Sequence, residues 1–484
     1  MRAYLALLLF SLSGSALFGR GITILVHPMQ NTGDTKYSWL NAGITATVIS
    51  DLGKIRDISV VSEADRKKVL KEVEFAMSGL VDDEKVVKVG KLLGANLIFS
   101  GSYLVIGNQI RINAHLIDVE KGSIEKTVKL DGTMEKLFDL QDRIVFSLLA
   151  ETEKIRISDI APIQITQQDK ESIRKDIRPS LSSYELYARG LEIQRKDPQK
   201  AMEYFRESLK RDPGYLDALR EAGNTAAKSL GLFDEALEYL NRTEKIIGKK
   251  HGKKSAQYAS LMNSTAVVYH DKGDFHKAVG FYIKSRDIYA KLQLQDTPGY
   301  ANLMNNLGIV CRNQGDLARA IGFYTESKKI RDRLGLQKTA GYAELMNNAG
   351  VAFQEKGENE NAIKGFSRAK DTYETIGLIK TAGYAALLNN LALVYKAQGD
   401  LPQALDFHLK SKAGFEELAL QRTEAYANVL YNSAIVYEKI GQTQEARNYF
   451  GQAYSTYAQL GRITEAQDAK RNADRLRSVE SRRD

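Results

Sequence analysis

The stretch YANLMNNLGIVCRNQGD, from Tyr300 to Asp316, carries four asparagines and one arginine among residues that are typical of a buried helix. Asparagine is a mediocre helix former and is costly to bury without a hydrogen-bond partner. The stretch belongs to a periodic pattern. Five Tyr-Ala pairs lie 42 residues apart and begin at Tyr258, Tyr300, Tyr342, Tyr384 and Tyr426. Such regular spacing predicts an array of structural repeats.

Each unit of this array contains two apolar stripes at helical spacing, separated by a glycine-centred turn. The turn glycines are Gly273, Gly315, Gly357, Gly399 and Gly441. The pattern predicts one helical hairpin per unit, with helices that face each other through Leu307, Gly308, Val310, Ala320, Tyr324 and Ser327 in the unit of Tyr300. Because one hairpin cannot bury its apolar face alone, the units are expected to stack.

These units resemble the tetratricopeptide repeat, and the 42-residue spacing with LMNN, LMNN and LLNN resembles the kinesin light chain variety. Two units of nearer the usual length precede them in the stretch from YARGLEIQRKDPQKAMEYF onward. The resemblance implies an all-α tetratricopeptide-repeat superhelical solenoid of about seven repeats over residues 183–463. A capping helix and basic tail are expected over residues 464–484.

The resemblance also implies that the first helix of each hairpin lines a concave groove for a peptide or protein segment. The candidate groove residues are Asn263, Asn302, Asn305, Arg312, Asn313, Asn347, Gln354, Asn389, Lys396 and Asn432. An amide both donates and accepts, which suits the backbone of an extended peptide. Alternatively, the asparagines bond to a neighbouring helix and fix the superhelix, which we expect mainly for the second members of the pairs, Asn306, Asn348 and Asn390.

Residues 20–155 alternate apolar strands with amphipathic helices and predict an α/β domain with a mixed sheet. Strands are expected at 22–26 and 58–61, followed by a meander with turns at Gly107-Asn108 and Lys121-Gly122; helices are expected at 40–52, 62–77, 82–93 and 137–148. Residues 156–182 are polar, contain Pro162 and Pro179, and predict a linker.

The α/β segment resembles the TolB amino-terminal-like domain through HPMQNTGDTKYSWLNAGITATVISDL, LGANLIFSGSYLVIGNQIRINAHLIDVEKGSI and LFDLQDRIVFSLLAE. That family accompanies repeat arrays in some bacterial adenylate cyclases and envelope proteins, and no catalytic residues are known for it. The cyclase catalytic domain has no counterpart in this sequence. The resemblance therefore implies an extracytoplasmic interaction module.

The first 19 residues predict a secretory signal peptide. One arginine precedes the apolar run from Ala3 to Phe10, and small residues follow, with Ala16 or Gly19 as cleavage points. The run is short for a membrane span, which needs about 20 residues. We therefore expect a protein exported to the bacterial periplasm or cell envelope, with membrane attachment only if the signal stays uncleaved as an anchor.

Composition and motifs argue against nucleic-acid binding and catalysis. The net charge of +9 comes from interspersed charges rather than basic runs. The histidines, at 27, 115, 251, 270, 276 and 408, show no metal-binding interval, and no phosphate loop or nucleophile elbow is present. Cys311, the single cysteine, excludes an intramolecular disulfide and is expected in the core. We expect no catalytic residue, metal or cofactor.

The sequence thus favours a non-enzymatic exported adaptor. Its repeat groove would bind a peptide or protein segment, and its amino-terminal domain would dock to an envelope component. One alternative is an oligomerising component of a secretion or surface-assembly machine, and another is a sensor module related to cyclase-linked domains.

Overall fold

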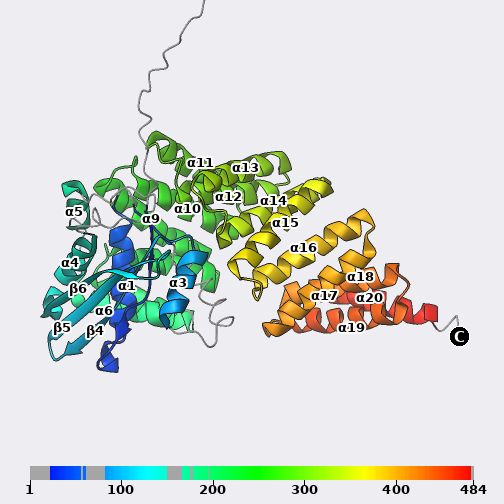
Figure 1. The fold of residues 1–484 in the computed structure, drawn as a ribbon, viewed down its shortest axis with the longest axis horizontal. Coiled ribbons are helices and arrows are strands. Elements are labelled where there is room, and N and C mark those ends of the chain that lie inside the picture. The colour runs from blue at the N-terminus through cyan, green and yellow to red at the C-terminus, as the bar shows by residue number, and fades with distance from the viewer. Residues whose placement is uncertain are drawn as a thin grey trace, which may run out of the picture.

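A mixed α/β region followed by consecutive helical hairpins makes up the protein (Figure 1), as the sequence predicts. The computed structural model describes residues 22–55, 58–61, 82–149, 166–174, 178–194 and 196–480. The expected signal peptide, at residues 1–19, and the expected helix over 62–77 lie outside these ranges. No helix within them is both long and apolar enough to cross a bilayer.

The sheet is mixed, with strand order β3-β1-β4-β5-β6 and with β2 paired to β4. Its strands are β1 (Ile22–Val26), β2 (Gln30–Asn31), β3 (Ile58–Val60), β4 (Leu97–Ile106), β5 (Gln109–Asp118) and β6 (Ile124–Thr133). β1 runs parallel to β3 and β4, whereas β4, β5 and β6 form an antiparallel meander. In the pair of β4 and β5, Tyr103 lies opposite Ile112.

Helices cover both faces of the sheet. α1 (Trp39–Leu52) and α4 (Leu137–Leu149) share a core cluster with Ile24 and Phe99. α3 (Asp82–Leu92) packs on the other face, where Ile98 lies in a separate apolar cluster. Because successive side chains of a strand point to opposite faces, the neighbours Ile98 and Phe99 belong to different clusters.

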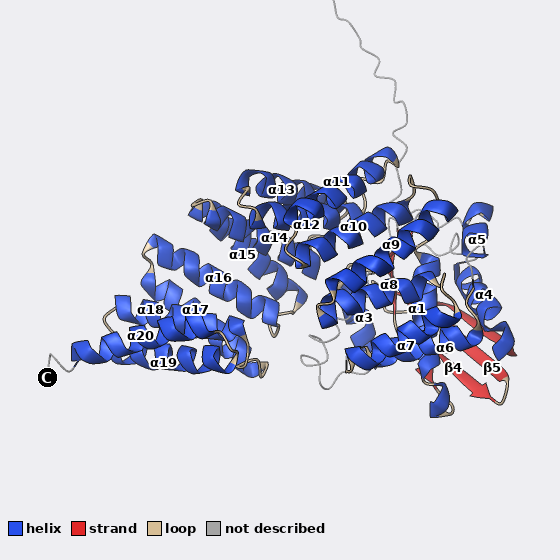
Figure 2. Cartoon of the chain, turned by 180° about the vertical axis from the view of Figure 1, so that it is seen from behind, coloured by secondary structure: helices blue, strands red, loops and turns tan. Residues whose placement is uncertain are grey.

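Seven helical hairpins follow within the described residues, and one further helix, α20, packs on the last of them. The hairpins are α6 (Leu181–Ile193) with α7 (Pro198–Arg211); α8 (Leu216–Asn224), continued by the π-helical η4 (Thr225–Ser229), with α9 (Phe233–Lys250); α10 (Ala256–Asp271) with α11 (Phe275–Lys291); α12 (Pro298–Asn313) with α13 (Leu317–Arg333); α14 (Ala340–Glu355) with α15 (Asn359–Ile376); α16 (Ala382–Gln398) with α17 (Leu401–Glu417); and α18 (Glu424–Lys439) with α19 (Thr443–Gln459). α20 spans Ile463–Glu480. Figure 2 shows the stack from behind, with the last hairpins extending away from the sheet.

Repeated local contacts explain why these residues form hairpins. The hydroxyls of Ser255, Thr297, Thr339, Thr381 and Thr423 cap the first helices by accepting a bond from the backbone N–H three residues on. A Cβ at Gly308 would lie 2.5 Å from the ring of Tyr324, so glycine allows the close approach of α12 and α13. The buried Ser327 hydroxyl donates to the carbonyl of Ala301, 2.8 Å away, which adds a polar tie between the same two helices.

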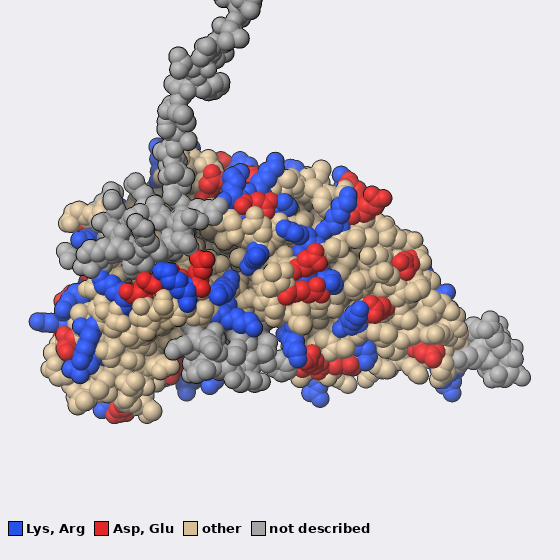
Figure 3. Space-filling model, viewed as in Figure 1, with Lys and Arg blue, Asp and Glu red and all other residues tan. Residues whose placement is uncertain are grey.

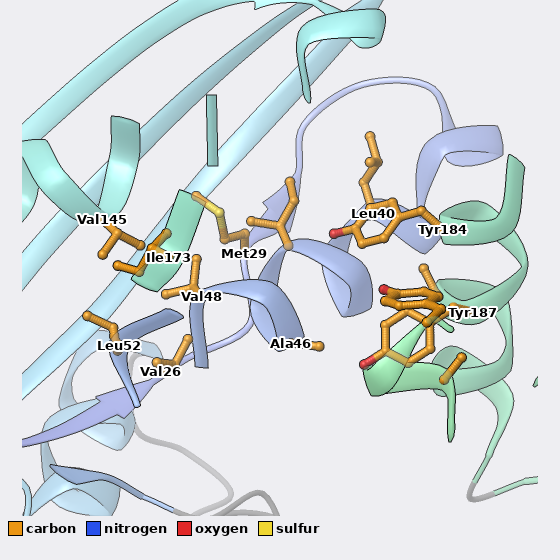
Figure 4. Packing of buried hydrophobic residues seen from close by; sticks show 14 of the residues in the cluster. Val26, Met29, Leu40, Ala46, Val48, Leu52, Val145, Ile173, Tyr184 and Tyr187 are labelled. Carbon is orange, nitrogen blue, oxygen red and sulfur yellow. The ribbon is translucent and has the colours of Figure 1, made fainter. Parts of the chain in front are cut away.

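The α/β region and the repeats share one continuous core. Tyr184 of α6 is fully buried and makes edge contacts with Trp39 of α1 and Phe138. Figure 4 shows Tyr184 and Tyr187 pointing toward the α1 helix. The predicted linker also contributes to this shared core. It contains the helix α5 (Gln167–Arg174), whose Ile173 is buried in the same cluster. Only short stretches of that segment are described, so its boundaries remain a prediction.

A second contact joins the α/β region to the middle of the array. Gly94, which follows α3, lies against Leu336 and Thr339 in the connection between α13 and α14, since a Cβ at Gly94 would meet their methyl groups at 3.2 and 2.9 Å. Val89 and Leu92 of α3 belong to one apolar cluster with α14 residues. The α/β region therefore contacts the array at α6 and again at α14.

Candidate functional site

A chamber lies between these two contacts. Its volume is about 1560 Å³. The α/β region forms one wall, and the first helices of four hairpins, α8, α10, α12 and α14, form much of the other together with part of α9. First helices thus line a hollow in this half of the array, where the α/β region covers them. Peptide binding in that hollow stays a prediction.

Several asparagine side chains lie along the wall of the chamber that the repeats form. Asn263, Asn302, Asn305 and Asn306 all line the chamber. The side-chain oxygen of Asn263 is buried and has no hydrogen-bond partner. The oxygen of Asn302 accepts a bond from the Arg331 guanidinium of the following helix. A buried oxygen that lacks a donor is unfavourable, and a ligand N–H group would reach it only if the Asn263 side chain turned toward the chamber.

Charged residues on the opposite wall are already paired. Lys54 lies 2.6 Å from Asp51, and Arg178 bonds to Asp142. Burial raises the pKa of the Asp51 carboxyl to about 6, although the nearby Lys54 charge opposes this shift. Because each of these four charges has an internal partner, this side of the chamber offers little net charge for recognition.

An amide ladder connects successive hairpins. The Asn348 amide donates to the oxygen of Asn305 over 3.3 Å, and Asn390 donates to Asn347 over 3.0 Å. The second member of one pair thus bonds to the first member of the preceding pair. For Asn348 and Asn390, these bonds fit the alternative in which the second asparagine of a pair is structural. The same bonds occupy the oxygens of Asn305 and Asn347, which the sequence places in a peptide-binding groove.

The remaining candidate residues lie outside the chamber. Asn313 is exposed and donates to the His270 ring of the preceding hairpin over 3.0 Å. Arg312 makes a loose contact of 3.9 Å with Glu355 of the next hairpin. Lys396 is half-buried, and burial together with the Lys439 charge lowers its pKa. Gln354, Asn347, Asn389 and Asn432 are half-buried on the later first helices, α14, α16 and α18.

Several chamber residues carry no signal in the sequence. Gln257, Ser260 and Ser264 of α10 line the repeat wall, as does Glu344 of α14. Whether such a residue lines the chamber depends on which part of each first helix the α/β region covers. The repeat period does not specify that part. Asn306, assigned from the sequence to a structural role, also lines the chamber.

The ladder leads to a prediction about two equivalent asparagines. Asn347→Ala removes an acceptor used by Asn390 and should lower the free energy of unfolding by about 0.5–1.5 kcal/mol. Asn389→Ala removes an oxygen that is buried without a partner and supplies a better helix former, so stability should stay unchanged or rise. Urea titration of both variants measures the difference. Equal destabilisation by the two substitutions would show that the bond between Asn347 and Asn390 adds no stability. A double-mutant cycle of Asn347→Ala with Asn390→Ala measures the coupling between these two residues directly.

The visible surface carries both charge signs interspersed, with no massed basic patch (Figure 3). No group of three His, Cys, Asp or Glu residues within the described ranges could hold a metal ion. Cys311 is buried, as expected, and burial raises the pKa of its thiol.

Comparison with known proteins identifies the repeats. The tetratricopeptide repeat family matches residues 215–291, 266–333, 341–417 and 383–459. A protein of Rhizobium meliloti (strain 1021) that bears the name of an adenylate cyclase is 25% identical over 201 residues, which make up 40% of this chain and 31% of that protein. The match thus spans under a third of the length of that curated relative.

Solved structures of repeat proteins also resemble the chain. BtubC from P. vanneervenii is 19% identical and matches over 56% of this chain and 92% of its own, with a TM-score of 0.38. Kinesin light chain repeats of Podosopora anserina are 16% identical over 43% of this chain and 98% of theirs, also with a TM-score of 0.38. A Rap protein complexed with Competence and Sporulation Factor is 12% identical over 72% of this chain and all of its own, with a TM-score of 0.44.

Proposed function

Because residues 215–459 carry tetratricopeptide repeats, we propose that the protein is a non-enzymatic interaction scaffold that holds an extended peptide segment in the chamber. The repeats themselves support a role in protein–protein interaction. That the ligand is a peptide, and that it binds in the chamber, is what we propose.

The observation that carries this proposal is the row of amides along the repeat wall. Asn263 and Asn305, one repeat apart, face the same chamber, and the Asn263 oxygen is buried without a donor. A peptide backbone offers N–H and C=O groups at regular intervals and can bond to such a row whatever its side chains are. Because the opposite wall is charge-paired, binding would depend more on backbone shape than on ligand charge.

The proposal includes export and docking to an envelope component. Its support is the apolar run Ala3–Phe10 followed by small residues, together with the resemblance of residues 20–155 to an envelope-associated domain. Amino-terminal sequencing of the mature chain tests export. The α/β region has a further role in this proposal, because it covers the first half of the groove and limits which segments can enter.

A blocked chamber tests the binding site. Ser260 is an exposed residue of α10 that lines the chamber, so Ser260→Trp should fill part of it without disturbing the core. Peptides selected from a random display library on the full-length protein should bind this variant at least about tenfold more weakly, the loss expected when roughly 1.4 kcal/mol of contacts is removed. Fluorescence anisotropy with the synthesised peptides gives the affinities.

The matched control is His276→Trp, which places the same ring at an exposed position of the neighbouring helix α11, away from the chamber lining. It should bind the selected peptides as the unmodified protein does. Equal binding by the Ser260 variant would mean that the peptides do not enter the chamber, and the proposed site would then be wrong.

A further inference from the structure

The five 42-residue hairpins carry aromatic residues at two equivalent positions, one on each helix. The first-helix position holds Tyr269, Cys311, Phe353, Tyr395 and Tyr437, and the second-helix position holds Phe281, Phe323, Gly365, Phe407 and Tyr449. Gly365 is the single member of the second set without a ring. The hairpin of α14 and α15 thus keeps one ring, Phe353, and lacks the other.

Where both rings are present, they pack on each other. The centroids of Tyr269 and Phe281 are 5.4 Å apart with an interplanar angle of 13°. Those of Tyr395 and Phe407 are 5.6 Å apart at 16°. Offset stacking of this kind contributes about 0.5–1.5 kcal/mol beyond the area buried. Phe353 has no such partner ring among the described residues, because its counterpart is Gly365.

In two of the hairpins with both rings, a lysine at one equivalent position covers the ring of the second helix. Lys284 lies 4.6 Å from the ring centre of Phe281, and Lys410 lies 5.8 Å from that of Phe407. The equivalent residue in the α14–α15 hairpin is Arg368. Arg368 therefore occupies the position from which a cation covers a ring, while the ring itself is absent.

A cavity lies where the ring is missing. It has a volume of about 560 Å³, and its lining includes Phe353, Met346, Gly365 and Arg368. Protein pockets that accept small molecules span roughly 300–1,000 Å³. The cavity is distinct from the chamber, because none of its lining residues belongs to the chamber wall.

The backbone explains why the protein does not fill this cavity itself. A Cβ at Gly365 would lie 3.1 Å from the Cα of Gly350 and 3.1 Å from the carbonyl oxygen of Met346. The two glycines thus bring α14 and α15 close together. A ring attached at position 365 would require the helices to move apart.

The charge around the cavity indicates what else a ligand should carry. Lys364 and Arg368 line it, are exposed, and form no ion pair with any described residue. Lys328, which also lines it, is paired with Asp332 at 2.6 Å. Two unpaired cations beside an apolar floor favour a carboxylate next to the inserted ring.

From these observations we infer that the cavity between α13 and α15 binds an aromatic side chain that a partner protein presents beside an acidic residue. The partner's ring stacks on Phe353 and takes the place of the missing aromatic residue, and Arg368 covers it. Lys364 and Arg368 neutralise the adjacent carboxylate. This site is separate from the chamber, and it would remain if the chamber bound no peptide.

The test uses the full-length protein and 3-phenylpropionate, which joins one aromatic ring to one carboxylate. Ligand-observed NMR should show saturable binding. The affinity should fall at least about threefold for 3-cyclohexylpropionate, which lacks the π face, and should be lost for 3-phenylpropylamine, which carries the opposite charge. Acetylated Asp-Phe-amide, the closest mimic of the partner segment, should bind more tightly than acetylated Lys-Phe-amide.

Variants locate the binding. Arg368→Glu should weaken 3-phenylpropionate binding about tenfold or more, and Met346→Phe should abolish it by placing a ring from α14 in the cavity. Lys410→Glu is the matched control, because it makes the same charge change over Phe407 in a hairpin that has both rings, and it should leave binding unchanged. Arg368→Lys should restore most of the affinity.

Three results would overturn the inference. One is the absence of saturable binding to the unmodified protein. Another is an equal loss in the Lys410 variant, which would indicate attraction to surface cations in general. The third is unchanged binding in a folded Met346 variant, which would place the ring elsewhere.

Discussion

Tyr184→Ala is expected to lower the free energy of unfolding by about 3–5 kcal/mol, the usual range for removing a buried aromatic ring. Tyr184 is fully buried, and its ring centre lies 5.1 Å from that of Phe138 and 6.1 Å from that of Trp39. Its hydroxyl accepts a bond of 2.7 Å from Gln141. The residue belongs to the first repeat helix, yet it fills the core of the α/β region, so its loss should destabilise both.

Urea denaturation followed by tryptophan fluorescence measures this effect, since Trp39 is the only tryptophan and contacts Tyr184. Tyr184→Phe is the control: it keeps the ring and removes the hydroxyl, and should cost about 1–3 kcal/mol because the buried Gln141 amide loses its acceptor. A loss below about 1 kcal/mol in the alanine variant would show that the α/β region does not depend on α6.

The linker that the sequence predicts over residues 156–182 would let residues 21–155 and 183–484 fold independently. The shared core predicts a different result. Tyr184→Ala should separate unfolding into two transitions, one for the α/β region and one for the later repeats, because it cuts the apolar cluster that joins them.

Acidification is expected to destabilise the protein through His408. Its side chain is fully buried in α17, and neither ring nitrogen has a hydrogen-bond partner. Burial, reinforced by the Lys396 charge, lowers the pKa of His408 to about 3. The unfolded chain has an ordinary histidine pKa of about 6.5, so between about pH 6.5 and 3 the unfolded state binds more protons.

The contribution of this neutral histidine is therefore fully present above about pH 6.5 and decreases as the pH falls toward 3. The loss should reach about 1.4 kcal/mol per pH unit within that window. Other groups titrate there too, including Asp51, so the measured quantity is the difference between the unmodified protein and His408→Phe. Urea midpoints at several pH values give this difference.

The other repeats show which residue can replace His408. Tyr282, Tyr324, Phe366 and Phe450 occupy positions equivalent to His408. Phe450 shares a core cluster with Ala434, which is equivalent to Ala392 in the hairpin of His408, so a phenylalanine should be accommodated there. His408→Phe should raise stability at neutral pH by about 1–3 kcal/mol, because two unpaired nitrogens are removed. An unchanged pH slope in this variant would show that His408 does not protonate on unfolding.

The repeat period allowed most of the array to be predicted. Gly308 and Tyr324 were expected at the contact between paired helices, and the structure confirms their close approach. The mixed sheet was also predictable, because the strands alternate apolar residues and the turn at Gly107 matches a tight hairpin. The resemblance of this region to a TolB amino-terminal-like domain stays a prediction.

The candidate site could be predicted only in part. The sequence places Asn263, Asn302 and Asn305 on first helices, and all three line the chamber. It could not show that Asn305 also accepts a bond from Asn348, because that contact joins residues 43 positions apart across two hairpins. The absence of Asn347 and Asn389 from the chamber depends on where the α/β region ends over the array.

The sequence by itself determined the local structure: the hairpins, their capping residues and the strands, because each depends on residues within one helix, one turn or one repeat. Tertiary structure alone decided how these parts are arranged. Tyr184 joins the first hairpin to α1, and Gly94 meets the connection before α14, so that the groove becomes a chamber. These contacts join surfaces far apart in the chain, and their complementarity depends on the curvature of the whole stack, which no single repeat specifies.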